Sequence, residues 1–392
     1  MNASPRISIV LTVLALILCA CGGSTPGGTQ VVAEVPSKAS AAPQQVVPPT
    51  PTLPTATSQP KPTATTAPTQ TPVPTATSKP VEAGASRSKP LSLGTEFKGK
   101  DWAITVSDVI RGQDAAQAIA KANQFNTPPK QGFEYLIANV KLKNVSTKQE
   151  AQSASMAVDL HITGDKNIAY SRASVVPPKQ LGGELFPNGA AEGQVVFEIP
   201  SDEKNLMFIV GELMSFDSKA MRFMAIDENA RLVPDPALKA IKPTDLGKRR
   251  DTPAKIGDKL ITGAWEFTIE EAIRGDKAAE LAKKANQFNK PAQDDQEYVA
   301  VKVKARYLGG NEPDRGENIN GGYLKITGEK NTVYESPSVV PPEPVLDATL
   351  FAGGQTEGWR VLSAGKDEKG LLVIFQPLLS FARDEARYIA LE

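Results

Sequence analysis

The sequence predicts an all-β protein, in which two antiparallel β-sandwiches lie in tandem after a disordered N-terminal stalk and each contains one short inserted helix. Three observations predict this class. Apolar and polar residues alternate with period two in several short segments beyond residue 100. A block of sequence that begins near Gly94 returns near Gly257 with the same landmarks in the same order. The 392-residue chain also starts with an apolar segment and a long Pro- and Thr-rich stretch.

Residues 1–20 have the features of an export signal. Arg6 supplies positive charge, and the apolar run Ile7–Leu18 is shorter than the roughly 20 residues that a transmembrane helix needs. The run ends in Leu18-Cys19-Ala20-Cys21, which resembles the lipobox of bacterial lipoproteins. The resemblance implies cleavage before Cys21, acyl chains on its sulfur, and anchoring by lipid at the extracytoplasmic face of the cell membrane. A plain secretory signal and an uncleaved anchor are the alternatives.

Residues 21–90 are predicted to form the stalk. Pro, Thr, Ala and Ser dominate this stretch, and no Phe, Trp or Tyr occurs between Gly22 and Glu96. Such a composition cannot bury enough apolar surface to offset the entropy of the chain. Closely spaced prolines favour polyproline II, which rises about 3.1 Å per residue. We therefore expect a disordered spacer that holds the folded part away from the membrane.

Two copies of one domain are predicted, at residues 91–233 and 255–392, with a Pro- and Lys-rich linker at 234–254. The repeat is far longer than the roughly 20–50 residues of solenoid repeats, which indicates duplication of a whole domain. No cysteine follows Cys21, so neither copy contains a disulfide. The landmarks that the copies share are Trp102 and Trp265, Arg111-Gly112 and Arg274-Gly275, Asn123–Asn126 and Asn286–Asn289, Glu134-Tyr135 and Glu297-Tyr298, Ile162–Gly164 and Ile326–Gly328, and Ser174–Pro178 and Ser338–Pro342.

The local pattern predicts mainly strands in each copy. Leu136, Ala138, Val140 and Leu142 alternate with more polar residues, as in a strand with one face in the core and the other in water. Short strands of this kind, separated by Gly- and Asn-containing turns, favour an antiparallel sandwich.

One helix interrupts the strands of each copy. The Ala-rich stretch from Asp114 to Phe125 predicts a helix with Asp114 as N-cap, which Asn126 and Pro128 terminate. The second copy repeats this pattern from Asp276 to Asn289. We expect each helix to cap one end of its sandwich.

These landmarks resemble a family of immunoglobulin-like extracellular domains of bacterial lipoproteins. The resemblance rests on Arg111-Gly112, the element Asn123, Asn126 and Pro128, and Glu134-Tyr135. It extends to the immunoglobulin-like sandwich of a small secreted mycobacterial antigen, and it implies that fold without any catalytic motif. Such domains are sometimes labelled telomeric repeat-binding factor-like, but the sequence shows no basic helix or basic face that would fit that label.

Composition excludes several function classes. Lys+Arg and Asp+Glu are each 44, whereas a general nucleic-acid binder needs basic excess. One histidine and two cysteines argue against a His/Cys metal centre and a Cys–His nucleophile pair. We therefore expect no catalytic residues, no metal, no cofactor and no nucleic-acid partner.

A contact with a partner is predicted at Trp359 and Val361. If the register of their strand holds, both face outward and form an exposed apolar patch. The alternative is a local register change that buries Trp359 and releases Arg360.

Other residue groups have simpler interpretations. His161 is predicted on the outer face of a strand, and the acidic loop Asp314–Gly322 is predicted to be a solvated hairpin loop, with Ca²⁺ binding as the alternative. Arg111 and Arg274 are predicted to pair with Asp114 and Asp276 near the helix starts.

The leading hypothesis is a non-enzymatic lipoprotein that presents two sandwich domains at the cell surface for binding a protein or another envelope component. A structural spacer of an envelope complex, with no ligand of its own, is the alternative. A hydrolase that uses paired carboxylates is a minor alternative, since no acid pair stands apart from the general surface charge.

Overall fold

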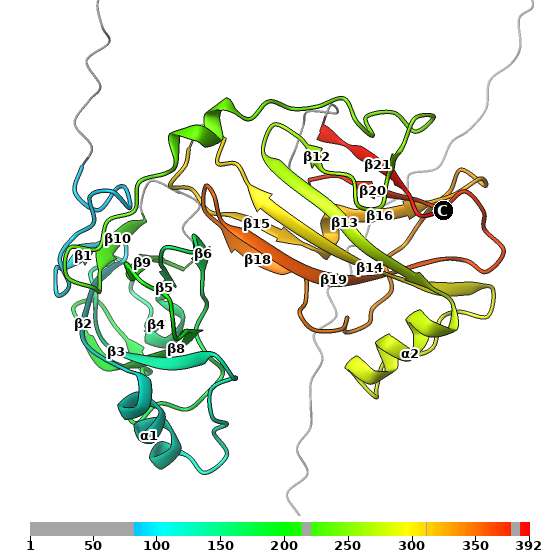
Figure 1. Cartoon of the computed structure of the whole chain (residues 1–392). Helices are drawn as coiled ribbons and strands as arrows, with labels where there is room; N and C mark the ends of the chain where they lie inside the picture. The colour runs from blue at the N-terminus through cyan, green and yellow to red at the C-terminus, as the bar shows by residue number, and fades with distance from the viewer. Residues whose placement is uncertain (1–81, 214–220, 311, 378–384) are drawn as a thin grey trace, which may run out of the picture. The chain divides into compact units, whose positions relative to one another are not determined.

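Two β-sandwiches make up most of the computed structural model, which describes residues 82–213, 221–310, 312–377 and 385–392 (Figure 1). All of these residues belong to one contact unit, Ala76–Glu392. The predicted signal, Cys21 and residues 22–81 of the predicted stalk lie outside the described residues. The predicted fold class is confirmed, because the described chain consists mainly of antiparallel sheets with one short α-helix in each copy.

The first sandwich pairs a four-stranded sheet with a three-stranded sheet. The larger has the order β1-β2-β3-β8 and the smaller the order β10-β9-β5, with antiparallel neighbours throughout. The strands are β1 (Phe97–Lys98), β2 (Trp102–Arg111), β3 (Phe133–Asn144), β5 (Val158–Thr163), β8 (Ala190–Pro200), β9 (Met207–Glu212) and β10 (Arg222–Ala225), with the short β4 (Gln152–Ser153), β6 (Ile168–Ala169) and β7 (Glu184–Leu185) in the connections.

The second sandwich repeats the larger sheet in the order β12-β13-β14-β19 and faces it with β11-β21-β20-β16-β17. Its strands are β11 (Ala254–Lys255), β12 (Leu260–Ile261), β13 (Trp265–Arg274), β14 (Gln296–Tyr307), β16 (Leu324–Thr327), β17 (Val333–Tyr334), β19 (Gln355–Gly365), β20 (Leu372–Phe375) and β21 (Arg387–Ala390), with β15 (Glu317–Asn320) and β18 (Asp347–Leu350) beside them.

The core residues of the strands are those that the period-two pattern predicts to face inward. In β3, Leu136, Ala138, Val140 and Leu142 are all buried against the opposite sheet. In the second sandwich the Phe267 and Phe375 rings stack at 3.8 Å between the two sheets. Because no disulfide can form in either copy, packing of this kind must stabilise both folds.

The two helices lie on the outer faces of the larger sheets, a correction to the prediction that they cap an end of each sandwich. Helix α1 (Gly112–Ala122) buries Ala115 and Ile119 against Tyr135 and Ile137, the residues of β3 that alternate with the core set. Asp114 lies in the first turn and does not cap the helix, since the N-cap position belongs to Arg111. Helix α2 (Asp276–Ala285) covers the equivalent face of the second sandwich (Figure 1).

A buried glutamate explains the repeated Ile-Thr-Gly landmark. Glu203 accepts hydrogen bonds from the Lys166 N–H at 2.8 Å and the Tyr170 hydroxyl at 2.7 Å, and so holds the hairpin after β5. A Cβ on Gly164 would lie 2.6 Å from Cγ of Glu203 and 2.7 Å from the Lys204 carbonyl oxygen, so glycine is favoured there. Glu368, Lys330 and Tyr334 make the same two bonds in the second sandwich, under Gly328.

We expect opposite pH dependence from Glu203→Gln and Glu368→Gln. Burial raises the pKa of Glu203, so this carboxyl loses its stabilising effect as pH rises through its folded-state value. Hydrogen bonds from Lys330 and Tyr334 lower the pKa of Glu368 below its ordinary value of 4.5. The stabilising effect of this carboxylate is therefore present above pH 4.5 and is lost as the pH falls. Melting temperatures from acidic to neutral pH should show Glu368→Gln destabilising mainly at neutral pH, whereas Glu203→Gln should gain stability relative to wild type as pH rises. Parallel curves for the two variants would contradict this assignment.

The segment before the first sandwich is bound to it, which corrects the predicted end of the stalk at residue 90. Gly84 accepts a hydrogen bond from the Phe223 N–H at 2.8 Å, and the Leu91 N–H donates to the Phe223 carbonyl at 2.8 Å. Gly84 takes a φ of +79°, which permits the tight turn into this edge pairing. Between these two contacts the Arg87 side chain is fully buried.

Direct contacts join the two sandwiches. Strand β6 of the first pairs antiparallel with β18 of the second, at Ala169 opposite Thr349. The Phe223 and Phe351 rings meet edge to face at 5.8 Å. Arg87 donates to Asp314 from Nε at 2.9 Å and to Asn167 from Nη1 at 2.6 Å, and its guanidinium lies 4.3 Å from the centre of the Phe351 ring.

The linker at 234–254 also packs on the second sandwich. It contains the 3-10 helix η3 (Pro236–Ala240), in which Leu238 is buried with Leu308 and Ala352. Farther along, the Thr244 carbonyl accepts a hydrogen bond from Nη2 of Arg387 at 2.9 Å. The predicted linker is therefore held on the second sandwich by apolar and hydrogen-bonded contacts.

Candidate binding site: a repeated aromatic turn

The turn that follows each helix exposes a phenylalanine at the same place in both sandwiches. Phe125 and Phe288 are each 81 % exposed, more than any other large apolar residue of the described chain. Burying a phenylalanine is worth roughly 1.5–3 kcal/mol, a gain that the isolated fold forgoes at both positions. The same exposed aromatic ring in both duplicated copies makes this turn a candidate binding surface.

An asparagine holds the backbone of each turn. Oδ1 of Asn123 accepts a hydrogen bond from the Phe125 N–H at 2.9 Å, and Asn286 makes the same bond to Phe288 at 2.9 Å. This Asx turn replaces the helical hydrogen bonding that ends at the asparagine. The aromatic ring is thus presented by a fixed backbone rather than by a loose loop.

A second asparagine clamps the turn to a proline-containing loop. Nδ2 of Asn126 donates to the carbonyls of Ile119 and Val176, both at 2.8 Å, and its Oδ1 accepts from the Val176 N–H at 2.9 Å. Asn289 makes the same three bonds, to Ala282 at 2.7 Å and to Val340 at 2.8 and 2.9 Å. The clamp explains why the Ser174–Pro178 and Ser338–Pro342 landmarks repeat with the turn.

The Glu-Tyr landmark also stabilises the aromatic turn. The Tyr135 hydroxyl donates to the Thr127 carbonyl at 2.9 Å, just beyond the turn, and Tyr298 donates to the Lys290 carbonyl at 2.8 Å. Nε of Arg111 donates to Glu134 at 2.7 Å, so the start of α1 is tied to β3.

The predicted pairs of arginine with aspartate at the helix starts are therefore wrong. Arg274 likewise bonds Glu297 at 2.8 Å and not Asp276. In the folded chain the next strand brings a glutamate closer to each arginine than the local aspartate.

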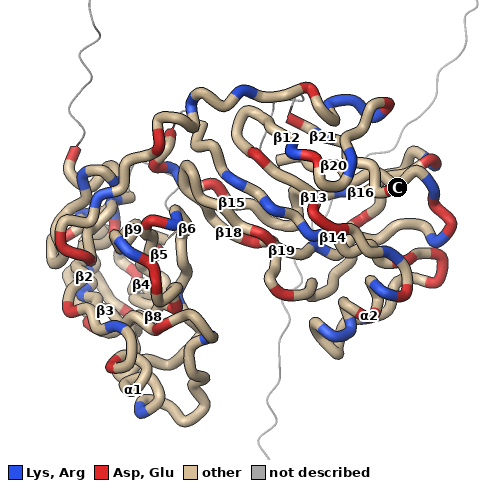
Figure 2. The backbone as a smooth tube through the Cα atoms, viewed as in Figure 1, with Lys and Arg blue, Asp and Glu red and all other residues tan. Residues whose placement is uncertain are grey.

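Lysines flank each aromatic turn in the sequence. Lys121 and Lys130 flank Phe125, whereas Lys283, Lys284 and Lys290 flank Phe288. No acidic residue occurs in 115–133 or in 281–293. Figure 2 shows basic residues at the end of each helix. The clamped valines, Val176 and Val340, are also exposed, so each turn and its clamped loop carry two exposed apolar side chains.

The predicted contact at Trp359 and Val361 is corrected at Val361. The register of β19 holds, and both residues face outward, but α2 covers this face and leaves Val361 only 1 % exposed. Val361 is therefore a packing residue beneath the helix and is not available to a partner. Trp359 is half-buried beside the same cluster, and its contact with a partner stays a prediction.

Arg360 points to the opposite side of the sheet from its neighbours. It takes the inward position that Val195 holds in the first sandwich, and its pairing opposite Val301 confirms the register. A Cβ on Gly321 would lie 2.4 Å from Cδ of Arg360, so this glycine makes the room for the long side chain.

The remaining sequence candidates do not form a metal site. His161 hydrogen-bonds Asp159 at 2.8 Å on the half-exposed face of β5. The acidic segment is corrected from a solvated loop, because Asp314 binds Arg87 and Glu317 begins strand β15, where it accepts from the Tyr323 hydroxyl at 3.2 Å. Within the described ranges, no three His, Cys, Asp or Glu side chains gather as they would around a metal ion.

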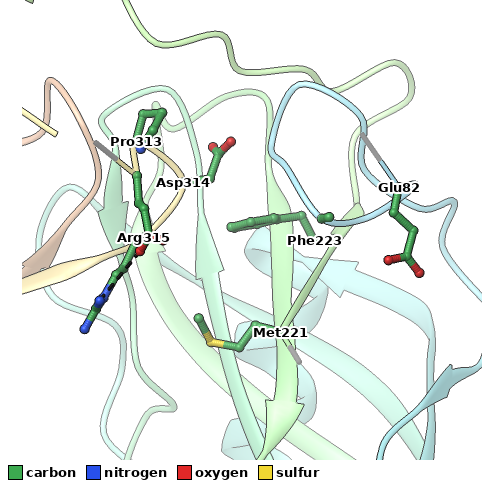
Figure 3. A pocket seen from close by; sticks show the side chains of 8 residues that line it. Glu82, Met221, Phe223, Pro313, Asp314 and Arg315 are labelled. Atoms are coloured by element: carbon green, nitrogen blue, oxygen red, sulfur yellow. Dashed lines mark ion pairs between the residues drawn. The ribbon is translucent and has the colours of Figure 1, made fainter. Parts of the chain in front are cut away.

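A cavity of about 370 Å³ lies where the sandwiches meet. Figure 3 shows Met221 and Phe223 of the first sandwich and Pro313, Asp314 and Arg315 of the second around it. Asp314 forms an ion pair with the buried Arg87, so the cavity lies next to a pair that joins the two sandwiches.

Sequence reasoning used the Asn-Gln-Phe-Asn landmark for the repeat and missed the exposed ring inside it. The signal was present: each phenylalanine stands between asparagines, after the helix end and before a proline, with no apolar neighbour in sequence. In the described part of the chain, none of the helices combines the length and apolar character that crossing a membrane requires.

Comparison with known proteins relates part of the chain to a domain of unknown function. Residues 91–221 match the model of DUF4352, a domain of unknown function. No curated protein matches the chain.

Several solved structures are similar over part of the chain. An uncharacterised β-sandwich protein from Clostridium difficile 630 is 13 % identical with a TM-score of 0.25, over 38 % of this chain and 99 % of that one. The yjhA protein from Bacillus subtilis is 17 % identical with a TM-score of 0.25, over 35 % and 99 %. The lipoprotein candidate ycdA from Bacillus subtilis is 14 % identical with a TM-score of 0.26, over 54 % and 73 %.

Proposed function

We propose that this chain is a non-catalytic lipoprotein that binds an envelope component through its two aromatic turns. The lipid on Cys21 holds the protein at the extracytoplasmic face of the cell membrane, and residues 22–81 connect the anchor to the sandwiches. The resemblance to the immunoglobulin-like mycobacterial antigen fits such an extracytoplasmic role. Neither catalysis nor a cofactor forms part of this function.

The equal exposure of Phe125 and Phe288 is the observation that supports the proposal most directly. The repeated landmarks around each ring, from the asparagines to the tyrosine, stabilise the turn and keep the ring in water. A pure spacer would gain by replacing both rings with polar residues, because nothing in such a function uses them.

The double variant Phe125→Ser/Phe288→Ser tests the function. We expect its melting temperature to stay at the wild-type value, because rings in water contribute little to the fold. Binding of the mature chain to isolated cell envelopes, with Cys21→Ser to remove the anchor, should be lost. Phe186→Ser is the matched control, since Phe186 is 63 % exposed and lies beyond the opposite end of β3. Equal envelope binding by the double variant and the control would favour the spacer.

A further inference from the structure

We propose that the aromatic turns bind the surface of an anionic lipid bilayer, an inference that rests on the proposed function and names its ligand. In each sandwich an exposed phenylalanine stands at the tip of a rigid turn among lysines. Peripheral proteins bind an anionic membrane in this way: an aromatic ring inserts among the acyl chains, and cationic side chains contact the headgroups.

The distribution of charge favours an anionic ligand. Acidic groups outnumber basic groups in both sandwich regions, yet the sequence from helix end to the residue after the turn, 121–130 and 284–293, contains lysines and no acid. One carboxylate from elsewhere reaches the first turn, since Glu198 accepts a hydrogen bond from the Lys130 N–H at 2.8 Å. The negative end of a helix also attracts basic residues, which accounts for Lys121 and Lys284. Lys130 and Lys290 lie beyond the helices, where the dipole does not explain them. Each lysine near an anionic surface adds to the attraction.

The hydrogen bonding of the turns permits entry into an apolar layer. Polar backbone groups that leave water must find partners within the protein. The N–H groups of Phe125 and Asn126 already bond Asn123, at 2.9 and 3.0 Å, and Asn126 satisfies the Val176 N–H and carbonyl. The prolines that follow, Pro128 and Pro177 among them, have no N–H to satisfy.

The shape of the turns favours a bilayer over a protein groove. Phe125 and Phe288 are the most exposed large apolar residues of the described chain, and the exposed valine of each clamped loop adds a second apolar side chain. A bilayer can accept a protruding aromatic side chain in any rotation of the protein about the membrane normal. The chain between Cys21 and Glu82 spans at most about 3.3–3.6 Å per residue, which is long enough for the turns to return to the anchoring membrane.

Vesicle co-sedimentation of the mature chain with Cys21→Ser tests the inference. The vesicles contain phosphatidylcholine alone or an equimolar mixture with phosphatidylglycerol. We expect binding to the mixed vesicles, weakening as salt rises. Phe125→Ser and Phe288→Ser should each weaken binding by at least about fivefold, and the double variant should abolish it. Lys130→Glu/Lys290→Glu should also weaken it, whereas Phe186→Ser should bind as wild type.

Two results would overturn the inference. One is that the wild-type chain fails to bind mixed vesicles, and the other is that the double phenylalanine variant binds them as well as the wild type does. If the double variant lost binding to envelopes while vesicles never bound, the proposed function would stand with a protein or wall polymer as its ligand. If neither binding depended on the rings, the proposed function would fall as well.

Discussion

Arg87→Ala is expected to lower the free energy of unfolding by about 3 kcal/mol, because removal of one partner of a buried ion pair leaves the other groups uncompensated. The Arg87 side chain is fully buried and Asp314 is 22 % exposed. Burial lowers the pKa of Arg87, although the hydrogen bond and charge of Asp314 act against this shift. The variant would leave Asp314 and Asn167 without their donor and the Phe351 ring without its cation.

Loss of this contact should also separate the unfolding of the two sandwiches. Trp102 reports on the first sandwich, whereas Trp265 and Trp359 report on the second. A Trp102→Phe background and a Trp265→Phe/Trp359→Phe background therefore allow each sandwich to be followed by fluorescence in urea. We expect nearly coincident transitions with Arg87 and distinct transitions in Arg87→Ala. Arg249→Ala is the control, because Arg249 is 73 % exposed and its pairing with Asp251 is worth little. Unchanged midpoints in Arg87→Ala would show that the pair does not join the sandwiches.

Asn289→Ala is expected to cost about 3 kcal/mol, since it removes three hydrogen bonds of about 1 kcal/mol each in a site that is nearly closed to water. The asparagine is only 9 % exposed and joins the end of α2 to the Val340 loop. Urea unfolding at neutral pH measures the loss. A change below about 0.5 kcal/mol, as for an ordinary surface substitution, would contradict the clamp.

Asn289→Asp separates the clamp from simple loss of packing. A carboxylate can still accept the Val340 N–H, but its second oxygen would face the carbonyls of Ala282 and Val340, to which the amide donates. Protonation restores a donor, so Asn289→Asp should be partly rescued as pH falls, whereas Asn289→Ala should show no such recovery. Equal pH profiles for the two variants would argue against donation by this side chain.

Local patterns were sufficient to predict the strands, the helices and the duplication. Alternation identified the inward residues of β3, and the shared landmarks identified two copies. The same alternation could not show what covers an outer face. Val361 faces outward, as its period predicts, yet α2 buries it. Burial of an outer face depends on where the chain returns in space, and period two contains no information about that.

The other differences between the predictions and the structure arise from contacts between residues that are far apart in the sequence. Arg111 was paired with the nearest acid in sequence, whereas β3 brings Glu134 to it. Arg87 looked like part of a solvated stalk, but Asp314, Asn167 and Phe351 from other parts of the chain enclose it. The exposed Phe125 and Phe288 were overlooked for the opposite reason, because an aromatic residue in a repeated motif is more often part of a core.

Accessibility of a thiol at the aromatic turn shows whether the turn is covered when the protein is on the envelope. The folded domains contain no cysteine, so in the mature chain with Cys21→Ser the substitution Phe125→Cys creates a unique thiol, while Phe288 remains to bind. We expect rapid reaction with a water-soluble maleimide in the purified chain and strong protection on intact envelopes, with Phe186→Cys reacting equally in both. Equal reactivity of the Phe125→Cys thiol in solution and on envelopes would contradict a binding role for the turn.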